Sequence, residues 1–211
     1  MIRKALIVTG GFCNVRAIAG RLPETDLIIA ADSGQNTCRA LGLTPHLICG
    51  DFDSSAVPAD GTAELVRVPV RKDVTDTMLA CNIAAERGAA ELTIVGGTGG
   101  RLDHTFSNVF FLEGLKRRGI EAVLTDGENT VRVLYAGDSA VLQKGRFRYF
   151  SVFALTDSVV SESGCSYPLA DAPLRRDDPY AVSNEITDET AVVSVRTGMI
   201  LLTESGLPAD T

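Results

Sequence analysis

The first 125 residues alternate short, mainly apolar runs with longer amphipathic stretches, and this alternation restricts the possible folds more than any other feature. One helical pattern ends near Leu41, and two longer ones span residues 76–87 and 103–118. Apolar runs suited to strands occur at residues 5–8, 27–31, 47–49, 65–68, 92–95 and 120–124. Because apolar strands separated by helices are typical of a parallel sheet covered on both faces, we predict an α/β domain here.

The pattern changes after about residue 126, beyond which no helical stretch of useful length follows. Short β patterns occur at residues 131–135, 140–143, 146–154, 191–195 and 199–202, with Gly-rich or acidic turns between them. Strands connected in this way predict a small antiparallel sandwich. We therefore expect a parallel-sheet α/β domain at residues 1–126, followed by an all-β sandwich domain at residues 127–211.

Charge and cysteine content limit the classes of partner. The net charge of -7 argues against nucleic acid or an anionic membrane, because such binding depends on a basic surface. A nucleotide would then require a metal ion or a local cationic pocket. The five cysteines show no CxxC pairing, which predicts buried free thiols in a reducing cytosol. No apolar segment approaches membrane-spanning length, so we expect a cytoplasmic protein.

Unusual polar clusters directly follow three of the predicted strands. They occupy residues 32–36, 50–54 and 96–103, and a fourth cluster at residues 72–76 precedes a predicted helix. In open α/β sheets, ligands bind beyond the carboxyl ends of the strands. We therefore expect all four clusters to face one crevice.

Two of the clusters are rich in aspartate. Asp51 and Asp53 flank Phe52, and residues two apart in an extended segment project to the same side. Carboxylate oxygens so placed suit Mg²⁺, although a solvated acidic turn also explains them. Asp73 and Asp76 suit the start of a helix as cap and first-turn residues, which is the simpler interpretation of that cluster. It leaves the neighbouring Lys72 unexplained, and Lys72 could contact a phosphate as a point charge.

The segment from Gly96 to Asp103 is the most unusual in the chain, because four of its first five residues are glycine. Glycines permit positive φ angles and a close approach of the backbone to a ligand. Backbone N–H groups here and at the following helix start suit a phosphate, and Arg101 adds a bidentate donor. The spacing is neither a Walker A loop nor G-x-G-x-x-G. A tight turn remains the alternative, and for the adjacent His104 a local hydrogen bond is the simpler role.

Taken in order, these motifs resemble the thiamine pyrophosphokinase family. The resemblance spans nearly the whole chain, and its order and spacing match the family's pattern. It rests on Ala31-Asp-Ser-Gly-Gln-Asn36, Pro45-His-Leu-Ile-Cys-Gly-Asp-Phe-Asp-Ser54, Lys72-Asp-Val-Thr-Asp76, Gly97-Thr-Gly-Gly-Arg-Leu-Asp-His104 with Asn108, and Ser183-Asn-Glu185. On its own, the last of these strings is also explained by a β-turn.

The resemblance implies an α/β catalytic domain, a thiamine-binding β-sandwich and a homodimer with shared active sites. It implies that the chain moves a diphosphate from Mg·ATP to the hydroxyl of thiamine, releasing AMP. The implied catalytic residues are Asp51, Asp53, Asp76 and Arg101, with Mg²⁺ held by Asp51, Asp53 and Asp76 and with Asp73 nearby. The implied nucleotide-binding residues are Asp32, Lys72, Thr98, Gly99, Gly100, Arg101 and Asp103. The implied thiamine-binding residues are Asn108, Ser183 and Asn184.

Three features depart from the family's pattern. Ser33 stands where a second glycine is usual, and Cys165 and Ser166 are less typical of the segment before Tyr167. The third is the stretch Leu174-Arg-Arg-Asp-Asp-Pro179, which is more charged than expected before Ser183-Asn184. The alternatives are a related Mg²⁺-dependent pyrophosphokinase acting on a pterin, and a non-catalytic sensor of thiamine diphosphate or nucleotide. The Ser183-Asn184 segment favours thiamine over a pterin, and a pure sensor need not keep a full metal cluster.

Overall fold

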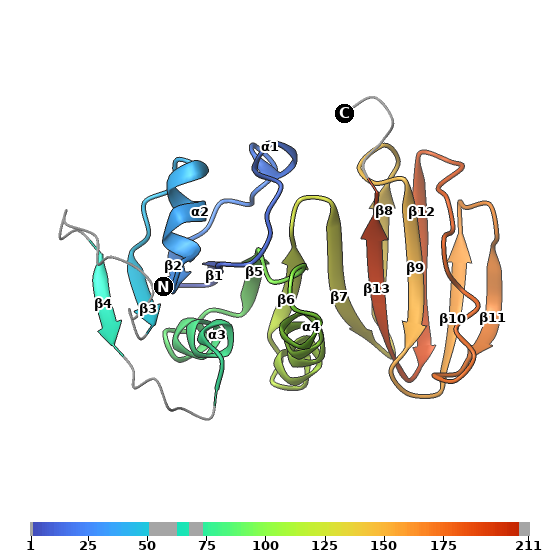
Figure 1. Cartoon of the computed structure of the whole chain (residues 1–211). Helices are drawn as coiled ribbons and strands as arrows, with labels where there is room; N and C mark the ends of the chain where they lie inside the picture. Colours follow the sequence, from blue (N-terminus) through green and yellow to red (C-terminus); the bar gives the residue numbers. More distant parts are fainter. Residues whose placement is uncertain (1, 51–62, 68–73, 207–211) are drawn as a thin grey trace. The chain divides into compact units, whose positions relative to one another are not determined.

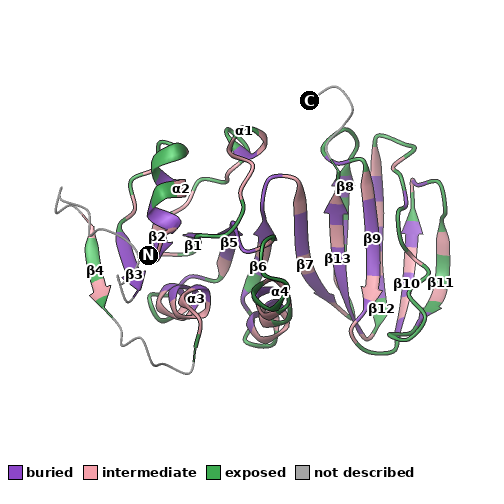
Figure 2. Ribbon diagram, viewed as in Figure 1, coloured by how far each residue is buried: buried purple, intermediate pink, exposed green. Residues whose placement is uncertain are grey.

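The computed structural model describes residues 2–50, 63–67 and 74–206. Contacts within the chain divide it into two compact units, Met1–Gly127 and Glu128–Thr211. Figure 1 labels the elements of both units, and Figure 2 shows that their buried residues are concentrated on the strands. No described helix is both long enough and apolar enough to cross a membrane.

The first unit contains a parallel sheet, which confirms the predicted α/β architecture. Its strand order is β4-β3-β2-β1-β5-β6, and every pair in it is parallel. The central strand β1 is buried over its last four residues, as expected for a strand that has neighbours on both sides. The strands are β1 Lys4–Val8, β2 Leu27–Ala31, β3 Leu47–Gly50, β4 Glu64–Arg67, β5 Glu91–Val95 and β6 Glu121–Thr125.

The described residues form four helices that cover this sheet, with α1 and α2 on one face and α3 and α4 on the other (Figure 1). They are α1 Val15–Ile18, α2 Gly34–Ala40, α3 Asp76–Glu86 and α4 Leu102–Arg117. The short α1 was not expected, because four residues carry no periodic pattern. Its Ile18 packs with Leu6, Val8 and Cys38 in one core cluster.

The buried stripe of α3 differs from the expected one. The periodic pattern places Met78, Leu79, Ile83 and Ala84 on one face of this helix, but the first three are only partly buried. The fully buried side chains are instead small ones, Thr77, Ala80, Cys81 and Ala84. Small residues let the helix approach the sheet closely, and the longer side chains are placed on the flanks of the contact.

The second unit is an antiparallel sandwich, again as predicted. Strands β7, β13 and β9 pair in that order, and a four-stranded sheet has the order β11-β10-β12-β8. Their inner faces share one apolar core that includes Leu142, Phe150, Val160 and Ile200. The strands are β7 Asn129–Tyr135, β8 Ser139–Gln143, β9 Tyr149–Ala154, β10 Ser158–Ser163, β11 Leu169–Leu174, β12 Thr190–Thr197 and β13 Met199–Ser205.

Strands β10 and β11 were not expected, and their sequences explain why. The inner face of β10 carries two buried polar residues, Ser158 and Glu162, so the usual alternation of apolar and polar residues is absent. In β11, Pro173 and the positive φ of Asp171 (46°) are both unusual within a strand. Such residues are tolerated on an edge strand, and β11 is the edge of its sheet.

Candidate functional site

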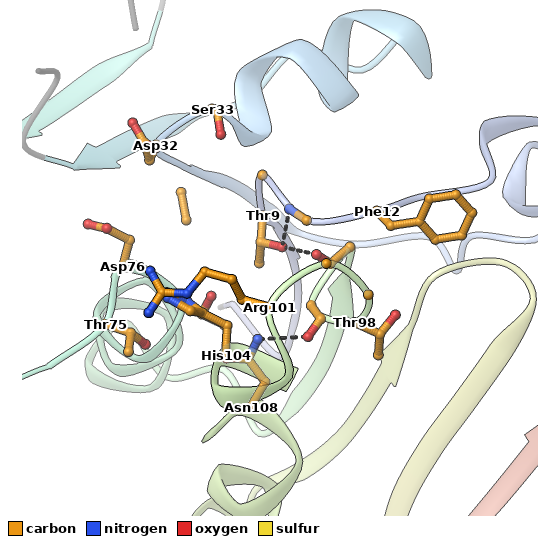
Figure 3. Close-up of a pocket in the computed structure, with 18 of the residues that line it drawn as sticks. Thr9, Phe12, Asp32, Ser33, Thr75, Asp76, Thr98, Arg101, His104 and Asn108 are labelled. Carbon is orange, nitrogen blue, oxygen red and sulfur yellow. Dashed lines mark hydrogen bonds between the residues drawn. The ribbon is translucent and has the colours of Figure 1, made fainter. Parts of the chain in front are cut away.

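A cavity of about 580 Å³ lies at the carboxyl ends of β1, β2 and β5. Figure 3 shows side chains from several elements converging on it, among them Thr9, Asp32, Asp76 and Arg101. Three of the four polar clusters contribute lining residues, as the position of ligand sites in open α/β sheets predicts. The fourth cluster, at residues 50–54, lies almost wholly outside the described residues.

Four of the predicted site residues also lie outside them. These are Asp51, Asp53, Lys72 and Asp73. Asp32 and Asp76 are the carboxylates that the described part of the chain contributes to the cavity wall. Within that part, no group of three His, Cys, Asp or Glu side chains is arranged to hold a metal ion.

The glycine loop is fixed to the end of β1. The Thr9 hydroxyl donates a hydrogen bond of 2.6 Å to the Gly96 carbonyl oxygen (Figure 3). A Cβ atom on Gly11 would lie 1.8 Å from that same oxygen, so only glycine permits this approach. Gly99 and Gly100 have φ angles of 78° and 64°, a region that other residues rarely adopt. Both glycines line the cavity.

Thr98 and Asn108 support this loop with their side chains. The Thr98 hydroxyl donates to Asp126 Oδ2 at 2.5 Å, and Asn108 Nδ2 donates to the Gly97 carbonyl oxygen at 2.8 Å. Asn108 is buried on α4, and Figure 3 shows its side chain directed toward the glycine loop. Both residues line the cavity, so the structure brings them together with the glycine loop.

Arg101 lies at the mouth of the cavity and is paired with Asp103. Its Nη2 lies 2.5 Å from Asp103 Oδ2, and its Nε lies 3.1 Å from Oδ1, which is a two-pronged contact. Hydrogen bonding to Arg101 is the main cause that lowers the pKa of Asp103, and Asp103 in turn raises the pKa of Arg101. Asp103 is not among the described residues that line the cavity, whereas Arg101 is.

The turn after β2 places Asp32 and Ser33 on the opposite wall. Asp32 has a φ of 48°, a left-handed conformation that is uncommon outside glycine but that aspartate tolerates better than most residues. Ser33 takes up the space left free by Gly10, since a Cβ on Gly10 would lie 1.9 Å from the Ser33 hydroxyl oxygen. Ser33 therefore fits at this position because its neighbour Gly10 has no side chain.

Asp76 lies in the first turn of α3, where the sequence placed it. The N-cap of this helix is Thr75, whose hydroxyl accepts a 3.2 Å hydrogen bond from the Met78 N–H. Asp73, the cap suggested by the sequence, is therefore not the N-cap residue. Asp76, the first residue of the helix, lines the cavity.

The two remaining predicted residues belong to the second unit and differ from each other. Ser183 is exposed, with a φ of 58°, and its N–H donates to the Ser151 hydroxyl at 3.0 Å. Asn184 is 4% exposed, and both ends of its side-chain amide are engaged within the unit. Only Ser183 therefore presents its side chain to solvent.

Sequence reasoning did not single out Thr9, Phe12 or Thr77, which also line the cavity. Thr9 follows β1 directly, so the same rule that selected the other strand ends would have found it. Phe12 is half exposed and forms an isolated bridge with Thr98, a contact between distant segments that no local pattern reveals. His104, for which the sequence left two roles open, lines the cavity, whereas His46 accepts a hydrogen bond from the Ile28 N–H.

Two family models match the chain. The first, for the catalytic domain of thiamin pyrophosphokinase, covers residues 20–124, and the second, for its vitamin B1 binding domain, covers residues 140–200. Thiamine pyrophosphokinase of Bacillus subtilis is 28% identical over 94% of this chain and 97% of its own length. Thiamin pyrophosphokinase 1 of Caenorhabditis elegans is 26% identical over 76% of this chain and 70% of its own length.

Solved structures give the same result. The crystal structure of the Bacillus subtilis thiamine pyrophosphokinase has a TM-score of 0.86 and 26% identity, over 97% of this chain and 99% of that one. The thiamin pyrophosphokinase of Geobacillus thermodenitrificans has a TM-score of 0.82, also at 26% identity, over 98% and 99%. With models of one family matching both of its units, the chain belongs to the thiamine pyrophosphokinase family of enzymes.

Proposed function

We propose that this chain transfers a diphosphate from Mg·ATP to the hydroxyl group of thiamine, giving thiamine diphosphate and AMP. The observation that carries the proposal is the cavity at the strand ends, where the glycine loop and Arg101 face Asp76 in a chain of this family. The loop and the guanidinium suit phosphates, and the aspartate suits a divalent cation. The role of residues 1–126 is then catalytic, and residues 127–211 bind thiamine.

The polyphosphate would be bound by the glycine loop and the cations beside it. Gly99 and Gly100 supply backbone N–H groups, and Arg101 supplies a guanidinium that is 75% exposed at the side chain and paired with Asp103. Exchanging that solvent-screened partner for a phosphate costs little. The full proposed nucleotide-binding set is Asp32, Lys72, Thr98, Gly99, Gly100, Arg101 and Asp103.

The donor chemistry of the described residues fits Mg²⁺. Asp76 contributes carboxylate oxygens to the cavity wall, and the proposal adds Asp51, Asp53 and Asp73 as further ligands. When bound, the ion would neutralise charge on the phosphates, which reconciles an acidic protein with an anionic substrate. Asp76→Asn is expected to remove most turnover and leave the fold intact, whereas Glu86→Gln at the exposed end of α3 is expected to change neither.

The remaining chemistry consists of positioning and charge stabilisation. The thiamine hydroxyl attacks the β-phosphorus of ATP, the bond from that phosphorus to the α–β bridging oxygen breaks, and AMP departs. Arg101, Lys72 and the loop N–H groups would stabilise the negative charge that develops on the phosphate oxygens. Asp76 and Asp103 are the two carboxylates considered as acceptors of the hydroxyl proton.

Thiamine binding is proposed for Asn108 and for the segment that contains Ser183 and Asn184, within a homodimer that shares its active sites between subunits. Large exposed apolar side chains occur on both units, as expected for surfaces that a second copy covers: Leu102, Phe106 and Phe110 on α4, and Tyr167, Tyr180 and Val182 in the second unit. The five cysteines are all free, which supports the proposed cytoplasmic location.

Incubation of the purified protein with Mg·ATP and thiamine tests the reaction. We expect AMP and thiamine diphosphate in equal amounts, separated by chromatography. Formation of ADP and thiamine monophosphate would mean γ-phosphoryl transfer instead. Turnover of a hydroxymethyl pterin but not of thiamine would favour the related pyrophosphokinase, and binding of both ligands without turnover would favour a sensor.

A further inference from the structure

Asn184 is the centre of a buried hydrogen-bond network in the second unit. Its Nδ2 donates to Glu162 Oε2 at 2.8 Å and to the Tyr167 carbonyl oxygen at 2.9 Å. Its Oδ1 accepts from the N–H groups of Tyr167 and Glu185, each at 3.0 Å. An asparagine amide offers two N–H donors and one oxygen with two lone pairs. All four are used, so the orientation of the amide is fixed and no capacity remains for a ligand.

Glu162 supplies one of these partners from an unusual position. It lies on the inner face of β10 and is 3% exposed, next to the apolar core that contains Val160 and Cys165. A buried carboxyl group is unfavourable unless it is hydrogen-bonded. Among the described residues, Asn184 bonds Oε2, whereas Oε1 has no hydrogen-bond partner. An apolar residue would suit this core position better than a carboxyl group, whose Oε2 here serves as the acceptor for Asn184.

Ser183 is the residue that this network fixes in place. It has a left-handed backbone, which costs energy in a residue other than glycine and persists only where neighbours enforce it. Asn184 and Phe150 exchange two backbone hydrogen bonds of 2.9 Å, which attach the segment to β9. Glu162 attaches the same segment to β10 in the other sheet of the sandwich. Ser183 is thus held between both sheets, with its side chain exposed.

We propose that Glu162 and Asn184 are positioning residues, which do not touch thiamine but hold Ser183 in the conformation that binds it. This inference rests on the proposed function, because it takes thiamine as the ligand of Ser183. It gives different roles to Ser183 and Asn184, which are neighbours in the motif Ser183-Asn-Glu185. Ser183 contacts the substrate, Asn184 orients the segment, and the Glu162 carboxyl group fixes Asn184.

Steady-state kinetics with two variants of Glu162 test the proposal. Glu162→Leu removes the acceptor and keeps an apolar volume, so we expect the KM for thiamine to rise about tenfold through loss of one buried hydrogen bond. The KM for ATP and kcat should stay within about twofold of wild type, because the phosphate site lies in the other unit. Glu162→Gln keeps an oxygen acceptor and should restore a near wild-type KM for thiamine.

Leu142→Ala is the matched control. Leu142 is 1% exposed on β8, at the far edge of the sheet that contains β10, and it belongs to the same core. We expect this variant to lose thermal stability through a cavity while the KM for thiamine is unchanged. If Leu142→Ala raises this KM as much as Glu162→Leu does, or if Glu162→Leu leaves it unchanged, Glu162 has no positioning role.

Amide hydrogen exchange in the absence of ligand separates this proposal from the proposed function. Glu162→Leu should accelerate exchange at the Asn184 N–H about tenfold relative to wild type, and Leu142→Ala should not do so selectively. If the wild-type protein makes no thiamine diphosphate, the proposed function fails, but the exchange data still show whether Glu162 holds the segment. Unchanged exchange in Glu162→Leu would overturn the positioning role.

A second variant applies if Glu162→Leu does not fold. Asn184→Asp keeps the acceptors for the Tyr167 and Glu185 N–H groups but loses both donated hydrogen bonds and faces the Glu162 carboxyl group. We expect the same selective rise in the KM for thiamine and the same faster exchange. A folded Asn184→Asp protein with wild-type kinetics and exchange would contradict the proposal.

Discussion

Arg101 illustrates how a single residue can be prepared for a ligand before the ligand binds. Its fork-shaped contact with Asp103 orients the guanidinium at the mouth of the cavity, yet both side chains are more than half exposed. Exposed ion pairs contribute little to stability because water and salt screen them. The contact therefore orders the side chain and leaves it available to an anion of higher charge.

Replacing Arg101 with lysine keeps the charge but removes the planar fork. We expect Arg101→Lys to lower kcat/KM for ATP by about a hundredfold, because a bidentate donor to developing phosphate charge is lost. Arg175→Lys is a matched control, since Arg175 makes a similar contact with Asp177 two residues on, far along the chain from the glycine loop. Equal losses in the two variants would show that the effect is not specific to the cavity.

Glu162 makes stability depend on pH. Burial raises the pKa of the Glu162 carboxyl group above its ordinary value of 4.5. The hydrogen bond from Asn184 lowers this pKa, but by a smaller amount. The folded state therefore binds this proton more tightly than the unfolded state does. The stabilisation of the folded state by the protonated Glu162 carboxyl group is fully present below pH 4.5. It is lost as the pH rises through the pKa that this group has in the folded state. The titratable groups that interact with it, Cys165 and Tyr180, both have raised pKa values and stay neutral in this window.

Glu162→Gln removes that titration without removing the acceptor. We expect the free energy of unfolding of this variant, measured by denaturant titration, to increase relative to wild type as the pH rises above 4.5. Below that value the two proteins should differ little, because the wild-type carboxyl group is then protonated. A difference that does not vary with pH would mean that Glu162 does not titrate with a raised pKa.

At the scale of elements, sequence patterns predicted most strands and helices but not how each one packs. β10 was missed because Ser158 and Glu162 take inner positions where apolar residues are usual. The inner face of α3 was assigned to large side chains, but contact with the sheet selects small ones. In the cavity, the strand-end rule found Asp32 and the glycine loop, whereas Phe12 depends on a tertiary contact that no local pattern contains.

The close packing of α3 can be tested by adding volume. Ala84 is fully buried, so we expect Ala84→Leu to lower the free energy of unfolding by about 1–3 kcal/mol through overpacking. The adjacent Ala85 is only partly buried, and Ala85→Leu should change stability by about 0.5 kcal/mol or less. Thermal or denaturant unfolding of both variants measures this difference. Equal tolerance of the two substitutions would show that the helix is not held close to the sheet.

At the scale of the whole molecule, the proposed site residues fall into two groups that belong to different units. The phosphate and metal residues lie within Met1–Gly127, and Ser183 and Asn184 lie within Glu128–Thr211. The proposed homodimer would supply each active site with the first unit of one chain and the second unit of the other. A symmetric dimer of this kind contains two equivalent sites.

Mixing two inactive variants tests whether the sites are shared. Asp76→Asn removes a proposed metal ligand, and Ser183→Trp blocks the proposed thiamine contact, so each homodimer has two broken sites. A mixed dimer would place both lesions in one site and leave the other intact. With random exchange about half the dimers are mixed, so roughly a quarter of wild-type activity should return. Two different affinity tags would verify the exchange. Mixed dimers that form but stay inactive would mean that each site is built within a single chain.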